Sequence, residues 1–184
     1  MANSGLDTIT FNIAGGGVHT IVLASALPDL TEAVVLDATS QPGYAGTPLI
    51  ELNGAGAGNN RAGLTLESGS GGSTIRGLAI NRFGGDGIHI TRSSGNLIEH
   101  NFIGTDPTGT LARGNGADGI ELYSNAANNI IRWNVISANN WGITIGIGSV
   151  ENARNIIQAN KIGTDVEITV PLGTIQYRIM DIRK

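Results

Sequence analysis

The 184-residue chain has no cysteine, 4% aromatic residues and 14% charged residues. The absence of cysteine excludes disulfide bonds and zinc sites with cysteine ligands. The formal net charge of −4 argues against a nucleic-acid groove, which needs a basic patch. No apolar run reaches the roughly 18 residues of a membrane-spanning helix. The first residues lack the basic and apolar regions of a signal peptide, so none is expected in this sequence.

Glycine, by contrast, is abundant, with 28 residues, and much of it lies in a repeated phrase. A Gly-hydrophobe-x-hydrophobe phrase occurs at residues 63–66, 87–90, 119–122 and 142–145. A second phrase, with two aliphatic pairs, follows each copy of the first. It occurs at residues 73–80, 96–103, 129–136 and 155–162. Short apolar alternations of period two, broken by Gly, Asn, Ser and Asp, are typical of short strands.

The spacing of the second phrase indicates a stacked repeat. Its anchors Ile75, Ile98, Ile131 and Ile157 lie 23, 33 and 26 residues apart, within the range of solenoid repeats. The longer step contains the turn-rich residues 104–110, which we interpret as a loop inserted at one bend. We therefore predict an all-β fold, a right-handed parallel β-helix of roughly seven coils.

We expect a single domain over residues 1–184. It divides into N-terminal coils at 1–62, regular repeats at 63–162 and a divergent terminal coil at 163–184. In the last segment, Ile168, Ile175 and Arg178 replace glycines of the earlier repeat. Bulky residues at turns that had allowed positive φ predict a different backbone path. We interpret this coil, natural or engineered, as a cap that limits association through the solenoid end.

Residues 6–13, 39–44, 47–52 and 101–106 together resemble the right-handed parallel β-helix repeat regions of large bacterial surface and secreted proteins. The resemblance covers roughly residues 5 to 165 and places the chain with the pectate-lyase-like superfamily in architecture. It implies a piece of a longer exported protein, extracellular or at the cell surface. Many members of that group have no assigned activity, so the resemblance specifies the fold and leaves the function open.

Stacking puts equivalent residues of successive coils about 4.8 Å apart. The columns formed by equivalent residues therefore indicate which side chains meet better than local motifs do. One inner column holds the four isoleucine anchors. Asn101, Asn134 and Asn160 form a predicted structural Asn ladder at a bend, where stacked amides satisfy each other's hydrogen bonds. Arg76, Glu99, Arg132 and Gln158 form an outer column, which we interpret as a solvated salt ladder.

Asp86 and Asp118 form the carboxylate pair of greatest interest, since each precedes the glycine of its phrase. His89 and Glu121 lie three residues later on the adjoining strands. Stacked carboxylates raise one pKa or recruit a cation, so the four residues could contact calcium or a carbohydrate. The alternative is that Asp before Gly forms a turn. We assign no catalytic residue, no metal ligand and no cofactor, with calcium the one ion considered.

Three functions follow from these observations. The first is a non-enzymatic structural or adhesive solenoid module of a larger exported bacterial protein, natural or used as an engineered scaffold. The second is a β-helix that binds or degrades carbohydrate, with Trp133, Trp141 and Tyr123 as a sugar platform if they share a face. The third is self-association through the solenoid ends. Polysaccharide or cell-surface components are the expected partners, and nucleic acid is not.

Overall fold

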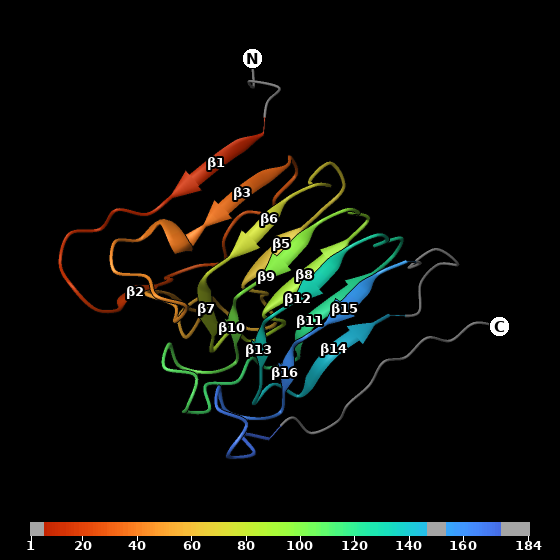
Figure 1. Ribbon diagram of the computed structural model, residues 1–184. Helices are drawn as coiled ribbons and strands as arrows, with labels where there is room; N and C mark the ends of the chain where they lie inside the picture. The colour runs from red at the N-terminus through yellow and green to blue at the C-terminus, as the bar shows by residue number, and fades with distance from the viewer. Residues whose placement is uncertain (1–5, 147–153, 174–184) are drawn as a thin grey trace.

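The computed structural model describes residues 6–146 and 154–173, and the chain in these ranges winds into stacked coils of short strands (Figure 1). The strands form three parallel sheets, here called sheets A, B and C. Sheet A contains β1 (Asp7–Thr10), β3 (Val34–Asp37), β6 (Thr74–Arg76), β9 (Leu97–Glu99), β12 (Ile130–Arg132) and β15 (Ile156–Gln158). The order of strands in space follows the order of coils in the chain.

Sheets B and C complete the cross-section of each coil. Sheet B contains β2 (His19–Val22), β4 (Ile50–Asn53), β7 (Leu78–Asn81), β10 (Phe102–Ile103), β13 (Val135–Ile136) and β16 (Lys161–Ile162). Sheet C contains β5 (Leu64–Leu66), β8 (Ile88–Thr91), β11 (Asp118–Tyr123) and β14 (Trp141–Ile145). The predicted parallel β-helix is confirmed, with six strands in each larger sheet where roughly seven coils were expected.

Helix is confined to one short 3-10 turn, η1 (Ala38–Ser40), within the described ranges. Asp37 begins this turn by accepting a hydrogen bond from the Thr39 backbone N at 3.0 Å. In the same ranges, no helix has the length and apolar character that a membrane crossing requires.

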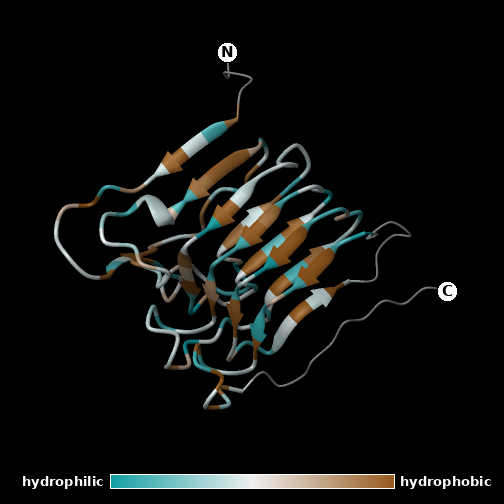
Figure 2. Cartoon of the chain, viewed as in Figure 1, coloured by the Kyte–Doolittle hydropathy of each residue, from teal (hydrophilic) through white to brown (hydrophobic). Residues whose placement is uncertain are grey.

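The core is a continuous stack of mostly aliphatic side chains between the three sheets. Figure 2 shows hydrophobic residues recurring along the strands of successive coils. Ile75, Ile98 and Ile131 are paired in register across β6, β9 and β12 and are fully buried. Ile157 of β15 packs against this core and is partly buried. Successive side chains of a strand point to opposite faces, so one face of each strand enters the core while the other points away from it. On sheet B the second face is also apolar, with Ala79, Phe102 and Val135 in a separate buried cluster.

The repeated glycine is required by close packing inside the coil. A Cβ added at Gly119 would lie 2.4 Å from Ile136 Cγ2, and one at Gly87 would lie 2.4 Å from Ile103 Cγ2. Contacts this short do not occur between real side chains, so larger residues would push the strands off the core. The glycines therefore fix how closely the coils approach at the start of β8 and β11, and with them the positions of the residues that come immediately before each glycine.

The Asn ladder runs through the bend between sheets A and B. Asn101 Nδ2 donates to Asn134 Oδ1 at 3.1 Å, and Asn134 Nδ2 donates to Asn160 Oδ1 at 3.0 Å. Backbone N–H groups at the bend also donate to these amide oxygens, such as Leu78 N to Asn101 Oδ1 at 3.1 Å. Two further ladders, which the sequence analysis missed, connect Asn96 with Asn129 and Asn155, and Asn115 with Asn139.

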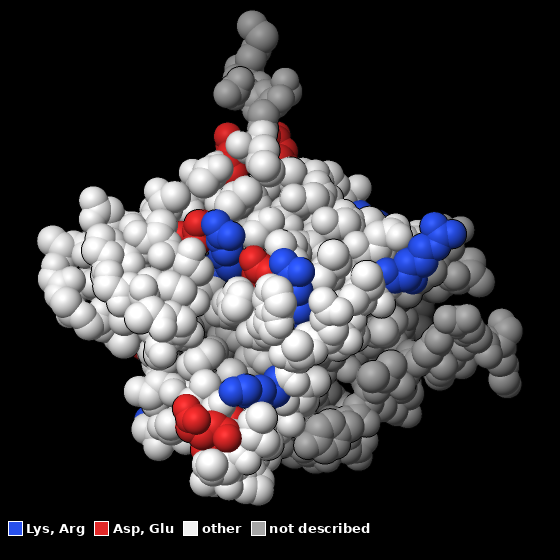
Figure 3. Space-filling model, viewed as in Figure 1, with Lys and Arg blue, Asp and Glu red and all other residues white. Residues whose placement is uncertain are grey.

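The outer column of sheet A is a chain of ion pairs that begins one coil earlier than expected. Arg76 lies 2.6 Å from Asp37 and 3.9 Å from Glu99, and Arg132 lies 2.9 Å from Glu99. Figure 3 shows this alternation of acidic and basic side chains across one face. The expectation of a solvated ladder is wrong at its centre, because Glu99 is only 6% exposed between its two arginines.

Two loops of sheet B, residues 104–113 and 163–172, have the same path and stack on each other. Asp106 N donates to Leu111 O at 3.0 Å in the first loop, and Asp165 N donates to Val170 O at 2.9 Å in the second. The predicted change of path at position 168 is wrong, because Ile168 keeps a positive φ of 61° where Gly109 has 72°. Positions 175 and 178 and half of the expected cap, residues 174–184, lie outside the described residues.

Candidate functional site

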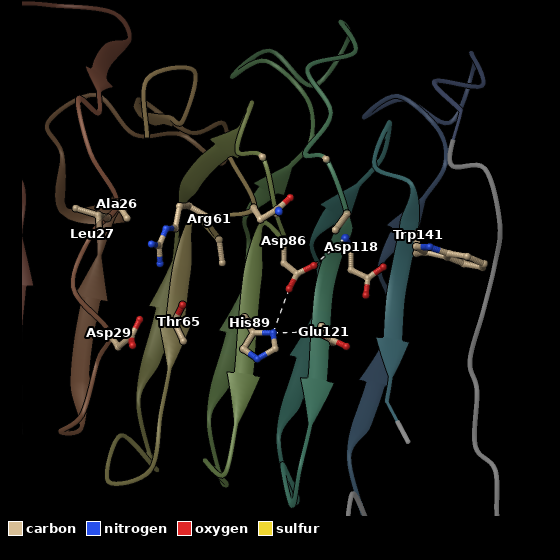
Figure 4. Close-up of a pocket in the computed structure, with 16 residues that line it drawn as sticks. Ala26, Leu27, Asp29, Arg61, Thr65, Asp86, His89, Asp118, Glu121 and Trp141 are labelled. Atoms are coloured by element: carbon tan, nitrogen blue, oxygen red, sulfur yellow. Dashed lines mark hydrogen bonds and ion pairs between the residues drawn. The ribbon is translucent and has the colours of Figure 1, made fainter. Parts of the chain in front are cut away.

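A groove lies on the outer face of sheet C, with a cavity volume of about 570 Å³ (Figure 4). Its polar lining includes the four residues that the sequence analysis brought together, Asp86, His89, Asp118 and Glu121. Trp141, at the start of β14 and one of the aromatic residues considered for sugar binding, also lines the groove. The structure adds two side chains that the repeat pattern did not indicate. These are Asp29, from the segment before β3, and Arg61, from the turn before β5.

Strand alternation turns His89 and Glu121 outward into this groove. The neighbours of His89 in β8, Ile88 and Ile90, are fully buried, so the imidazole lies on the opposite face. His89 pairs in register with Thr65 on one side and Glu121 on the other. The column is therefore a direct result of parallel stacking of like sequences.

Asp86 and Asp118 lie immediately before Gly87 and Gly119, and the two coils are joined at this point. The backbone N of Asp118 donates to Asp86 Oδ1 at 2.9 Å, and Gly87 N donates to Asp118 O at 2.8 Å. The Asp86 carboxylate thus has one oxygen bound to the next coil and the other directed at His89. Residue 141, which aligns with Asp118 in β14, is tryptophan.

Asp86, His89 and Glu121 converge on one nitrogen. His89 Nδ1 lies 3.1 Å from Asp86 Oδ2 and 2.9 Å from Glu121 Oε2. One ligand atom from each of the three residues lies within 4.8 Å of the other two, which is close enough to hold one metal ion. The three side chains are 13%, 24% and 25% exposed for Asp86, His89 and Glu121, so the cluster is sheltered but reachable from the groove.

The two carboxylates change the proton affinity of the histidine. Hydrogen bonds to Asp86 and then Glu121 raise the pKa of His89 to about 9, since they stabilise the charged imidazolium. Burial acts in the opposite direction and is outweighed. At neutral pH the imidazolium is therefore the cation that balances the cluster.

Asp118 stands apart from the three converging residues. It is 7% exposed, and its Oδ1 is buried without a hydrogen-bond partner in the described part of the chain. Burial and then the negative charge of Asp86 raise the pKa of Asp118 to about 6. The Thr144 hydroxyl and His89 offset this increase in part.

The three aromatic residues proposed as a sugar platform do not line the groove together. Trp141 lines it, whereas Trp133 lies at the bend between β12 and β13 with a φ of 55°. The Arg132 guanidinium lies 4.2 Å from the centre of the Trp133 ring, and the His100 ring lies 5.0 Å from it. Tyr123, at the end of β11, is 6.4 Å from the His89 ring and is 39% exposed.

The fold and the cluster together define a parallel β-solenoid with a candidate cation site on the outer face of its smallest sheet. Residues 8–171 match the family model described as "Periplasmic copper-binding protein (NosD)", and the chain belongs to the NosD family. The periplasmic description agrees, at a coarse level, with the expected export from the cytoplasm. No curated protein matches the chain.

Proposed function

We propose that this chain is a non-enzymatic periplasmic solenoid that binds copper as Cu²⁺ through Asp86, His89 and Glu121. The observation that carries the proposal is the convergence of one imidazole nitrogen and two carboxylate oxygens within 4.8 Å. The copper-binding description of the family supports the choice of metal. The rest of the solenoid then serves as a rigid support for the site.

The donor set fits Cu²⁺ better than Cu⁺. Cysteine is absent from the sequence, and the two methionines, Met1 and Met180, lie outside the described residues. Thiolate and thioether sulfurs are the donors that favour Cu⁺, whereas imidazole nitrogen and carboxylate oxygen suit Cu²⁺. For a given set of nitrogen and oxygen donors, Cu²⁺ also binds most tightly among the divalent first-row metals.

Titration with Cu²⁺, followed by electron paramagnetic resonance, tests the proposal. We expect one high-affinity ion per chain, with hyperfine coupling to a single imidazole nitrogen. His89→Gln should lower the affinity by about 100-fold or more, since even the residues that support metal ligands are worth about 10- to 100-fold. His100→Gln is the matched control, because it makes the same change at a bend outside the groove. Equal affinity of the His89→Gln variant and the unmodified chain would contradict the site.

Carbohydrate binding is the second candidate, and the shape of the groove favours it. Trp141 offers an aromatic face at one end, and Arg61, Asp29 and the cluster acids offer hydrogen-bonding groups along the floor. Aromatic faces and polar groups in one cleft are the usual means of holding sugars. Such a role would make polysaccharide or cell-surface glycans the partners of this module.

Binding assays with neutral and acidic oligosaccharides separate the two candidates. If sugar binding is the function, Trp141→Ala should abolish the binding, while His89-dependent Cu²⁺ binding should persist. An assay for unsaturated or reducing-end products should remain negative, because we assign no catalytic residue. Product formation that disappears in Asp86→Ala would instead identify a polysaccharide-degrading enzyme.

A further inference from the structure

The outward column of sheet C continues one coil past the three converging residues. In β11 and β14, Glu121 pairs in register with Thr144, and Asp118 pairs with Trp141. Asp118 and Glu121 therefore lie next to Trp141 and Thr144 of β14 in the way that Asp86 and His89 lie next to Asp118 and Glu121 of β11. The pair Asp118 and Glu121 thus repeats the pair Asp86 and His89 one coil further along the groove, with carboxylate oxygens in place of the imidazole nitrogen.

Asp118 has the features of a metal ligand in this second pair. It is more than nine-tenths buried and it lines the groove, yet its Oδ1 has no hydrogen-bond partner among the described residues. Thr144 Oγ1, on the neighbouring strand, is likewise buried without a partner of normal geometry there. Figure 4 shows the Asp118 carboxylate between the Glu121 and Trp141 side chains.

A buried carboxylate oxygen with no hydrogen-bond partner costs free energy, and the same fold avoids that cost elsewhere. On sheet A, Asp37 is paired with Arg76, and Glu99 lies between Arg76 and Arg132. The one arginine that lines the groove, Arg61, makes no ion pair within the described ranges. Among the described residues, Asp118 thus makes no ion pair with an arginine, unlike the acids of sheet A.

We propose that Asp118 anchors a second cation position in the groove, and that this position takes a hard ion such as Ca²⁺. Glu121 and the Thr144 hydroxyl provide the neighbouring oxygen donors. Carboxylate and hydroxyl oxygens without nitrogen or sulfur suit Ca²⁺, and water in the groove completes the six to eight ligands it requires. Glu121 is the one donor that this position shares with the proposed copper site, whereas Asp118 and Thr144 belong to this position alone and His89 to the copper site alone.

Terbium is a suitable probe, since it replaces Ca²⁺ and emits light when a nearby tryptophan is excited. The sequence has two tryptophans and three tyrosines, so a Trp133→Phe background excited at the red edge of the spectrum, where tyrosine does not absorb, leaves Trp141 as the only donor. We expect saturable Trp141-sensitised Tb³⁺ emission that Ca²⁺ displaces. Asp118→Asn should weaken Tb³⁺ binding by about tenfold or more, the loss of about 1.4 kcal/mol.

Two comparisons distinguish this inference from the copper proposal. His89→Gln should keep its Tb³⁺ affinity within about twofold while it loses Cu²⁺, and Asp118→Asn should keep Cu²⁺ while it loses Tb³⁺. Thermal melting of each variant shows whether it remains folded, and Asp118→Glu provides a second substitution that retains the charge. Tb³⁺ binding of unchanged affinity in Asp118→Asn, or no saturable emission from the parent, would overturn the inference.

Discussion

Sheets A and C present outward columns with the same spacing and opposite arrangements of charge. On sheet A, acids and arginines alternate from Asp37 to Arg132, so each buried acid has a basic neighbour in the next coil. On sheet C, Asp86 and Asp118 are stacked as like charges, and His89 is the cation that touches Asp86 and Glu121. Parallel stacking thus imposes the columns without imposing charge pairing. The face without arginine partners is the one for which we propose cation binding.

The largest expected loss of stability comes from a substitution in the core behind both faces. Ile131→Ala should lower the free energy of unfolding by about 2 to 5 kcal/mol, because Ile131 is fully buried and the coils on either side limit collapse of the cavity. Urea denaturation followed by circular dichroism measures the loss. A loss below about 1 kcal/mol would mean that the stack relaxes around the cavity far more than such packing allows.

Removal of one acid from each face tests the comparison directly. Glu99→Gln should destabilise the protein by about 1 to 3 kcal/mol, because it leaves Arg76 and Arg132 without their shared partner in a buried position. The arginines are partly exposed, which keeps the loss below that of a fully buried pair. The same denaturation measurement gives the value.

Glu121→Gln is the matched change on sheet C, and it should cost less than about 1 kcal/mol. Glu121 is 25% exposed and Asp86 remains to hold the imidazolium. If the two variants lost equal stability, the distinction between a paired structural face and a binding face would not hold.

The two faces should also differ in their response to pH. The folded pKa of His89 is raised from 6.5 to about 9, so its contribution to stability is complete below about pH 6.5 and is lost as the pH rises through 9. The folded pKa of Asp118 is raised from 3.8 to about 6, so the protein loses stability as the pH rises from about 4 to 6.

Melting temperature against pH, in the absence of metal, gives this profile. His89→Gln should flatten the decline between about pH 6.5 and 9, and Asp118→Asn should flatten the one between about pH 4 and 6. Glu99→Gln should leave the decline in melting temperature unflattened in both pH ranges. A decline that survives in both groove variants would assign the titration to other groups.

The smallest expected effect comes from the two stacked loops of sheet B. Ile168→Gly should stabilise the protein by about 0.5 to 1 kcal/mol, because a β-branched residue at a φ of 61° is strained where Gly109 is not. The greater freedom of glycine in the unfolded chain offsets part of this gain. Differential scanning calorimetry detects the change, and Val170→Gly, at a position without positive φ, should not stabilise the protein.

Much of the fold could be predicted from the spacing of particular residues. Ile75, Ile98 and Ile131 share a column because residues that repeat once per coil must stack. Asn101, Asn134 and Asn160 could be placed together by the same rule. The path of the last coil could not, because the hydrogen bonds of Asp165 hold Ile168 in a conformation that its own preference disfavours.

By itself, the sequence determined the all-β solenoid and the grouping of Asp86, His89, Asp118 and Glu121, since both depend only on which residues recur at equivalent positions of a coil. The tertiary structure alone decided what that grouping can do. The approach of both carboxylates to a single imidazole nitrogen, and the burial of Asp118 Oδ1 without a hydrogen-bond partner among the described residues, depend on side-chain directions in neighbouring coils. The groove depends on segments that lie outside the repeat, with Asp29 and Arg61 brought to it by the N-terminal coils.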